Sequence, residues 1–172
     1  MRECFGHFLW GLLYAWEGRF EEAAEALRGA IDADPEVVGS YVELGMVYAC
    51  LGRYGEMVGV LRQAAGVGPS AVRAYLGEGP QLGARRHHPA SVEGAKETAS
   101  RIVMTAASLI ASGWDREAAG RLEMAVQIDR SNGPAVMLLA IAYLLLGEDA
   151  AEAGRKSVFR GIPELASELF GD

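Results

Sequence analysis

The residues of this chain that could carry out chemistry are few, and most are histidines. His87 and His88 stand together in the segment Arg85-Arg86-His87-His88, which is the only basic cluster, and His7 stands alone near the start. Adjacent histidines point apart unless the backbone bends, and no aspartate or cysteine lies nearby to complete a zinc ligand set. We therefore expect no metal site there. The segment is either a solvated insertion or a docking loop.

The other reactive side chains do not form a catalytic set either. Cys4 and Cys50 are too few for a disulfide framework, and both sit in apolar helical stretches, where a cysteine is usually a small buried hydrophobe. Gly77-Glu78-Gly79 has no preceding strand, so it matches a nucleotide-binding loop poorly. We expect no enzyme activity and no cofactor. A reducing, cytoplasmic location fits the cysteine usage.

Composition narrows the class of partner. The 172 residues are 51% apolar and 23% charged, which predicts a folded chain, and the net charge is −7. An acidic chain lacks the basic face that nucleic acids and anionic membranes require. The apolar run from Phe5 to Trp16 is too short to span a bilayer and has no signal-peptide cleavage site, so it predicts a buried helix.

An internal repeat in the sequence indicates which helices position the side chains of this chain. The first two copies share ten positions at identical spacing, and their turn glycines lie 34 residues apart, as do those of the third and fourth copies. The four copies read Trp10-Gly11-Leu12-Leu13-Tyr14 with Gly18, Ala23, Leu27, Ala30 and Pro35; Leu44-Gly45-Met46-Val47-Tyr48 with Gly52, Met57, Leu61, Ala64 and Pro69; Thr105-Ala106 with Leu109, Gly113, Ala118, Leu122 and Ala125; and Leu139-Ala140 with Tyr143 and Gly147.

These residues resemble the tetratricopeptide repeat (TPR) family. The resemblance implies an all-α fold: a right-handed α-α superhelical solenoid of about four helix pairs, with glycine at each turn and proline ending the second helix. We expect one domain over 1–172. Its repeats would cover about 4–37, 38–71, 99–132 and 133–162, with an insertion over about 72–98 that contains a loop from Gly77 to Pro89, and a capping helix over about 163–170.

In this family the concave face, lined by the first helix of each repeat, binds partners. Mapping each copy onto that face gives almost only apolar residues, which excludes the polar clamp that some relatives use on acidic chaperone tails. Large exposed apolar patches usually mark interfaces. The predicted partner-binding groove consists of Phe5, Phe8, Leu12, Trp16, Val42, Met46, Val103, Ala107, Ile110, Met137, Ile141 and Leu145.

The expected function is therefore a non-enzymatic adaptor, scaffold or chaperone that holds an apolar or amphipathic segment of a partner protein. Two alternatives stay open. A self-assembling module would dock its uncapped first repeat, with Phe5, Phe8 and Trp10, on another copy. A chaperone similar to those of type III secretion would share the size and the acidic, groove-bearing build. In a further alternative, neighbouring repeats or the insertion fill the groove.

Overall fold

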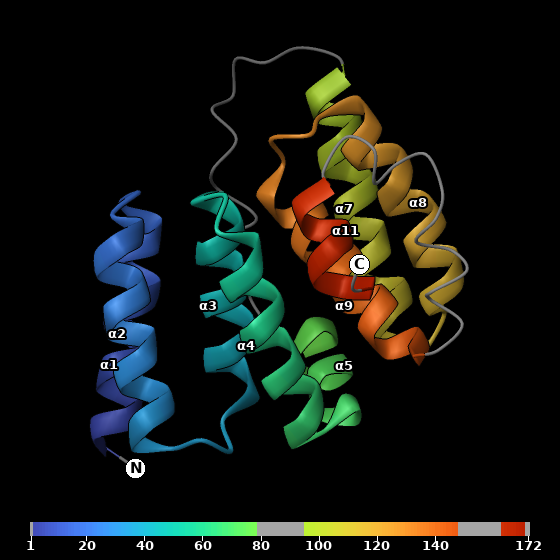
Figure 1. The fold of residues 1–172 in the computed structure, drawn as a ribbon. Helices are drawn as coiled ribbons and strands as arrows, with labels where there is room; N and C mark the ends of the chain where they lie inside the picture. The colour runs from blue at the N-terminus through green and yellow to red at the C-terminus, as the bar shows by residue number, and fades with distance from the viewer. Residues whose placement is uncertain (1, 79–94, 148–162, 171–172) are drawn as a thin grey trace.

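The computed structural model describes residues 2–78, 95–147 and 163–170, and all regular secondary structure in these ranges is helical (Figure 1). Successive helices lie side by side and pack through one apolar core, as the repeat pattern predicts for an all-α chain. The helices are α1 (Arg2–Trp16), α2 (Phe20–Ala33), α3 (Val38–Cys50), α4 (Tyr54–Val67), α5 (Pro69–Glu78), α7 (Ala95–Ala111), α8 (Asp115–Ile128), α9 (Gly133–Leu146) and α11 (Pro163–Phe170).

The turns within the helix pairs α1/α2, α3/α4 and α7/α8 share one local structure. Gly18, Gly52 and Gly113 have φ of 78°, 71° and 83°, a left-handed conformation that costs glycine little. The amide of the residue after each glycine donates to a carbonyl five residues earlier, at 2.9 Å in all three turns, which closes a Schellman motif. The glycine spacing of the sequence therefore predicts the turns correctly.

The small residues of the repeat allow the two helices of a pair to approach closely. A Cβ on Gly11 of α1 would lie 2.5 Å from Cγ of Leu27 on α2. A Cβ on Gly45 of α3 would lie 2.8 Å from Cδ2 of Leu61 on α4. Both leucines are buried, so each occupies the space that its glycine leaves open. The contact recurs at the 34-residue interval of the sequence.

Helices α3, α5, α7 and α9 close into a ring, because α3 contacts α5, α5 contacts α7, α7 contacts α9, and α9 contacts α3. Helix α9 also touches α4, α8 and α11, and its residues from Ala135 to Tyr143 are all buried. A helix that is apolar on every side is stable only in such a place. The open groove that the sequence predicts between these helices is therefore filled by the chain's own side chains.

The segment after α4 differs from its prediction. Pro69 was expected only to end the preceding helix, but it is also the first residue of α5, where its fixed φ and missing amide hydrogen are tolerated. Residues 72–78 of the predicted insertion are thus helical. Residues 95–98 of the predicted insertion belong to α7, and the part from 79 to 94, with His87 and His88, lies outside the described residues. The second helix of the predicted fourth repeat, which would fall after Gly147, lies outside them as well. The helix expected at 163–170 is present as α11, and its Leu165 is fully buried.

A candidate protein-binding surface

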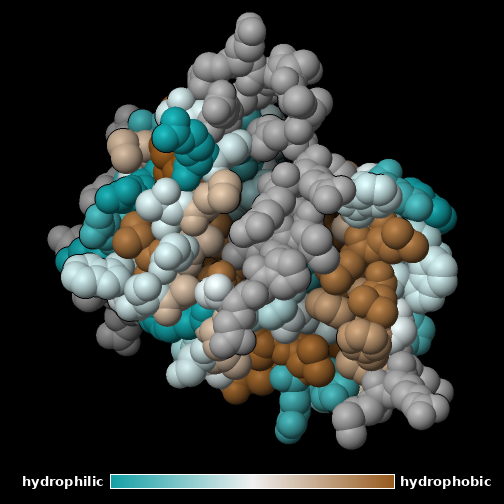
Figure 2. Space-filling model, turned by 180° about the vertical axis from the view of Figure 1, so that it is seen from behind, coloured by the Kyte–Doolittle hydropathy of each residue, from teal (hydrophilic) through white to brown (hydrophobic). Residues whose placement is uncertain are grey.

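The largest group of exposed apolar side chains lies on α1, at one end of the molecule. Phe5, Leu9, Leu13 and Trp16 follow one another at intervals of four, four and three residues, which places them on a single face of the helix. Their exposed fractions are 62%, 47%, 39% and 50%, and the neighbouring Trp10 is 55% exposed. We call these five residues the α1 face; Figure 2 shows a brown area over this helix.

The opposite side of α1 holds the helix in place. Cys4, Gly11 and Ala15 are buried there, and Gly11 receives Leu27 of α2. No charged residue occurs between Cys4 and Trp16, so the helix is apolar on both sides although only one side is covered. The expectation of a buried helix from Phe5 to Trp16 is therefore wrong for its outer side.

One edge of the α1 face is formed by stacked side chains. The rings of Trp10 and Tyr14 stack with centroids 5.7 Å apart, and the guanidinium of Arg19 lies 4.4 Å from the Tyr14 ring centroid. Arg19 is held in turn by ion pairs with Glu17, at 3.0 Å, and with Glu22. An indole fixed in this way loses little rotamer entropy when a partner covers it, which is a property of binding hot spots.

The corresponding face of α3 shows what covers such a surface elsewhere in the chain. The residues 34 positions after Phe5, Leu9 and Trp16 are Gly39, Glu43 and Cys50. Gly39 and Glu43 face Tyr75 of α5, and the thiol of Cys50 lies beside Gly133 of α9. Helices therefore cover this face of α3, whereas no described helix covers it on α1.

The predicted groove residues divide into two groups. Those of the first copy are accessible: Phe5 and Trp16 are exposed, and Phe8 and Leu12 are partly buried, as is Leu145 of α9. The other seven are at most 6% exposed because the ring of helices closes over them, so the expectation that they line an open groove is wrong. These buried residues are Val42, Met46, Val103, Ala107, Ile110, Met137 and Ile141.

The side chains with potential for chemistry are dispersed. His7 is exposed on α1, Cys4 is buried, and Cys50 is exposed at the end of α3, contrary to its expected burial. Desolvation of the part of Cys50 that packs inward raises the pKa of its thiol to about 11, so at neutral pH it stays protonated. Within the ranges that the structure describes, no group of three His, Cys, Asp or Glu residues could hold a metal ion.

A buried carboxyl group lies between α3 and α5. Glu43 is 4% exposed, and Tyr75 donates a hydrogen bond of 2.7 Å to its Oε1. Burial raises the pKa of Glu43 to about 7, although the hydrogen bond from Tyr75 acts in the opposite direction. The group has the pKa of a general acid or base, but it contacts the core instead of an open cavity. It bears on stability, as discussed below.

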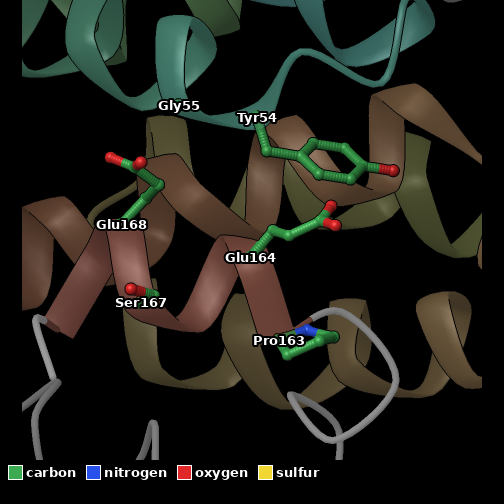
Figure 3. Close-up of a pocket in the computed structure, with 6 residues that line it drawn as sticks. All are labelled: Tyr54, Gly55, Pro163, Glu164, Ser167 and Glu168. Atoms are coloured by element: carbon green, nitrogen blue, oxygen red, sulfur yellow. The ribbon is translucent and has the colours of Figure 1, made fainter.

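A shallow cavity of about 540 Å³ lies where α4 meets α11 (Figure 3). Tyr54 and Gly55 of α4 face Glu164 and Glu168 of α11 across it, and Gly55 lets the carboxylate of Glu168 approach. Burial, followed by the charge of Glu164, raises the pKa of the Tyr54 hydroxyl, which therefore stays protonated at neutral pH. The carboxylates would favour a cation over an anion, but the arrangement offers no activated nucleophile.

Sequence reasoning missed two members of the α1 face, Leu9 and Leu13, because the repeat places their equivalents on α3 inside the molecule. The signal that could have found them is the absence of charge between Cys4 and Trp16, which leaves apolar residues on every side of the helix. Glu43 was also missed. It is the only charged residue of α3, and an isolated carboxylate in an apolar helix is a sign of burial.

Comparison of the chain with models of protein families, with curated proteins and with solved structures finds no match. None of the helices in the described ranges has the length and apolar character needed to cross a membrane.

Proposed function

We propose that this chain is a non-enzymatic protein-interaction module that binds an apolar or amphipathic surface of another protein through the α1 face. The observation that carries the proposal is the row of Phe5, Leu9, Leu13 and Trp16, 39–62% exposed on a helix whose other side is buried. Isolated exposed apolar residues are ordinary, but a contiguous group of this size usually marks an interface. Such side chains suit burial against a partner rather than proton transfer.

The size of the surface supports the proposal. Aromatic side chains have about 150–250 Å² each, so the three half-exposed rings of Phe5, Trp10 and Trp16 present about 350 Å². Burying that area is worth roughly 9 kcal/mol gross at about 25 cal/mol/Å², before association costs of at least about 4 kcal/mol. A partner helix of about four turns would be long enough to follow α1, whose 15 residues span about 22 Å.

The proposal includes a TPR-like architecture, with α1/α2, α3/α4 and α7/α8 as helix pairs and α9 as the first helix of a fourth. What supports this architecture is the recurrence of turn and contact at 34 residues, as in Gly11 with Leu27 and Gly45 with Leu61. The right-handed superhelical path and the count of four repeats stay predictions. The binding surface proposed here lies at the amino-terminal end of the array instead of in a concave groove.

The test is selection from a displayed library of amphipathic helical peptides. We expect the wild-type chain to enrich peptides with aromatic or aliphatic residues at three- and four-residue spacing. Phe5→Ser with Trp16→Ser should bind a selected peptide at least tenfold more weakly. Met104→Ser with Met124→Ser, on the equally exposed surfaces of α7 and α8, is the matched control and should bind as wild type. Equal binding by all three chains would place the site elsewhere, and no enrichment would refute the proposal.

A further inference from the structure

We infer that the partner bound by the α1 face is a second copy of this chain, with the two α1 helices packed antiparallel about a twofold axis. The inference rests on the proposed function and names its partner. Three features of the α1 face carry it: its area, its lack of charge and the palindromic order of its residue types.

The area is sufficient for a dimer. With Leu9 and Leu13, the α1 face presents about 500 Å² of apolar surface, so two copies would bury about 1,000 Å² before any polar rim is counted. Specific interfaces need at least about 1,000 Å² in total. A contact of this size lies at the low end of the range and predicts a dissociation constant in the micromolar range.

Charge selects the α1 face over the rest of the surface. The chain carries a net charge of −7, so two copies repel one another over most approaches. The stretch from Cys4 to Trp16 has no charged residue, and the ion pairs of Arg19 with Glu17 and Glu22 neutralise part of the charge just beyond it. A second copy can therefore approach this face with little repulsion, and its own α1 face presents matching apolar side chains.

The order of residue types along the α1 face, aromatic, leucine, leucine and aromatic, is the same in both directions, so a twofold contact would pair like with like. In an isologous interface each residue pair occurs twice, and an axis near position 10–11 places position 5 opposite position 16 and position 9 opposite position 13, to within about one residue. Each pairing joins an aromatic to an aromatic or a leucine to a leucine. Antiparallel helices also oppose their dipoles, which favours this orientation over a parallel one. The two Trp10 rings, each stacked on Tyr14 of its own chain, would lie on either side of the axis.

Light scattering after gel filtration, over protein concentrations from low to high micromolar, tests the inference. We expect the mass to rise to twice the 18.3 kDa of one chain. Leu9→Glu with Leu13→Glu brings four carboxylates together at the axis and should raise the dissociation constant at least 100-fold. Met104→Glu with Met124→Glu should leave the constant unchanged. Circular dichroism verifies that all chains are helical. A wild-type monomer throughout, or an undiminished dimer of the Leu9/Leu13 variant, would overturn the inference.

A cross-linking experiment tests the antiparallel geometry without depending on a disruptive variant. In a Cys50→Ser background, which leaves the buried Cys4 as the one native thiol, we mix chains carrying Leu9→Cys with chains carrying Leu13→Cys. Mild oxidation should join the two kinds to each other faster than either to itself, and preferential self-linking would refute the arrangement. The two proposals can fail separately. A monomer that still binds the selected peptides through α1 refutes only the dimer, whereas a monomer without peptide binding refutes both.

Discussion

Replacing Glu43 with glutamine should stabilise the fold at alkaline pH and leave it almost unchanged in acid. The carboxyl group is 4% exposed and accepts one hydrogen bond, from Tyr75. Glutamine keeps the shape and the accepting oxygen but carries no charge at any pH. The variant therefore removes the cost of holding a carboxylate in the core while keeping the contact between α3 and α5.

The magnitude follows from the pKa of Glu43, which is 4.5 in an ordinary setting and about 7 in the folded chain. Because the folded state holds the proton more tightly than the unfolded state, stability is highest below about pH 4.5. It falls as the pH rises towards 7, and it is level above that. The difference between the two pKa values corresponds to roughly 3 kcal/mol of lost stability. Glu43→Gln should recover about 2–3 kcal/mol of this at pH 8.

Urea unfolding followed by circular dichroism, repeated between pH 4 and pH 8, measures the effect. The free energy of unfolding of Glu43→Gln should lose the part of the pH dependence that lies between about 4.5 and 7. Glu25→Gln, at an exposed carboxylate of α2, is the matched control and should follow the wild type. Parallel pH profiles for wild type and Glu43→Gln would refute the reasoning, because they would mean that the buried group stays ionised at no cost.

Two further predictions concern an ion pair between helices and a glycine in a turn. Asp115→Asn should lower the free energy of unfolding by about 2–3 kcal/mol in urea titrations, because Arg73 makes two hydrogen bonds of 2.6 Å to that carboxylate between α5 and α8. A loss below about 0.5 kcal/mol would show that Arg73 finds other partners. Gly52→Ala should cost about 1 kcal/mol by thermal unfolding because its φ is 71°, whereas Gly59→Ala, in helix α4 with open space at Cβ, should stabilise by about 0.5–1 kcal/mol. If both glycine substitutions raised the stability, or both lowered it, the conclusion that alanine is strained in the turn would be wrong.

The helix pairs could be predicted from the sequence because their determinants are local. A left-handed turn needs glycine wherever it occurs, and Gly18 and Gly52 stand at the same distance from the large and small residues that pack around them. Tyr48 is buried, and its hydroxyl accepts a hydrogen bond of 2.9 Å from Arg28. Contacts inside one pair span few residues, so the pattern is sufficient to specify them.

The closure of the ring could not be predicted in this way. The closure depends on the path of the chain between α4 and α7. A 34-residue pattern specifies how two helices pair, but it does not specify the path of the chain where the pattern is interrupted. The contact of Glu43 with Tyr75 illustrates the difficulty. The repeat pattern assigns Glu43 to the second repeat and Tyr75 to the insertion. It therefore gives no reason to expect a hydrogen bond between them. Long-range packing determined both outcomes.

Two helices of this chain are free of charge along most of their length, α9 and, from Cys4 onward, α1. The two helices have similar apolar compositions, and both contributed residues to the predicted groove. Position separates them: α9 is enclosed by five helices that share its contacts, whereas α1 is covered on one side by α2 and lies at the end of the array. A helix without charge costs nothing when it is enclosed, but at an end it leaves Phe5, Leu9 and Trp16 in water. The proposed surface therefore lies on the uncharged helix that no described helix covers on its outer side, because the interior that the groove would have used is already occupied.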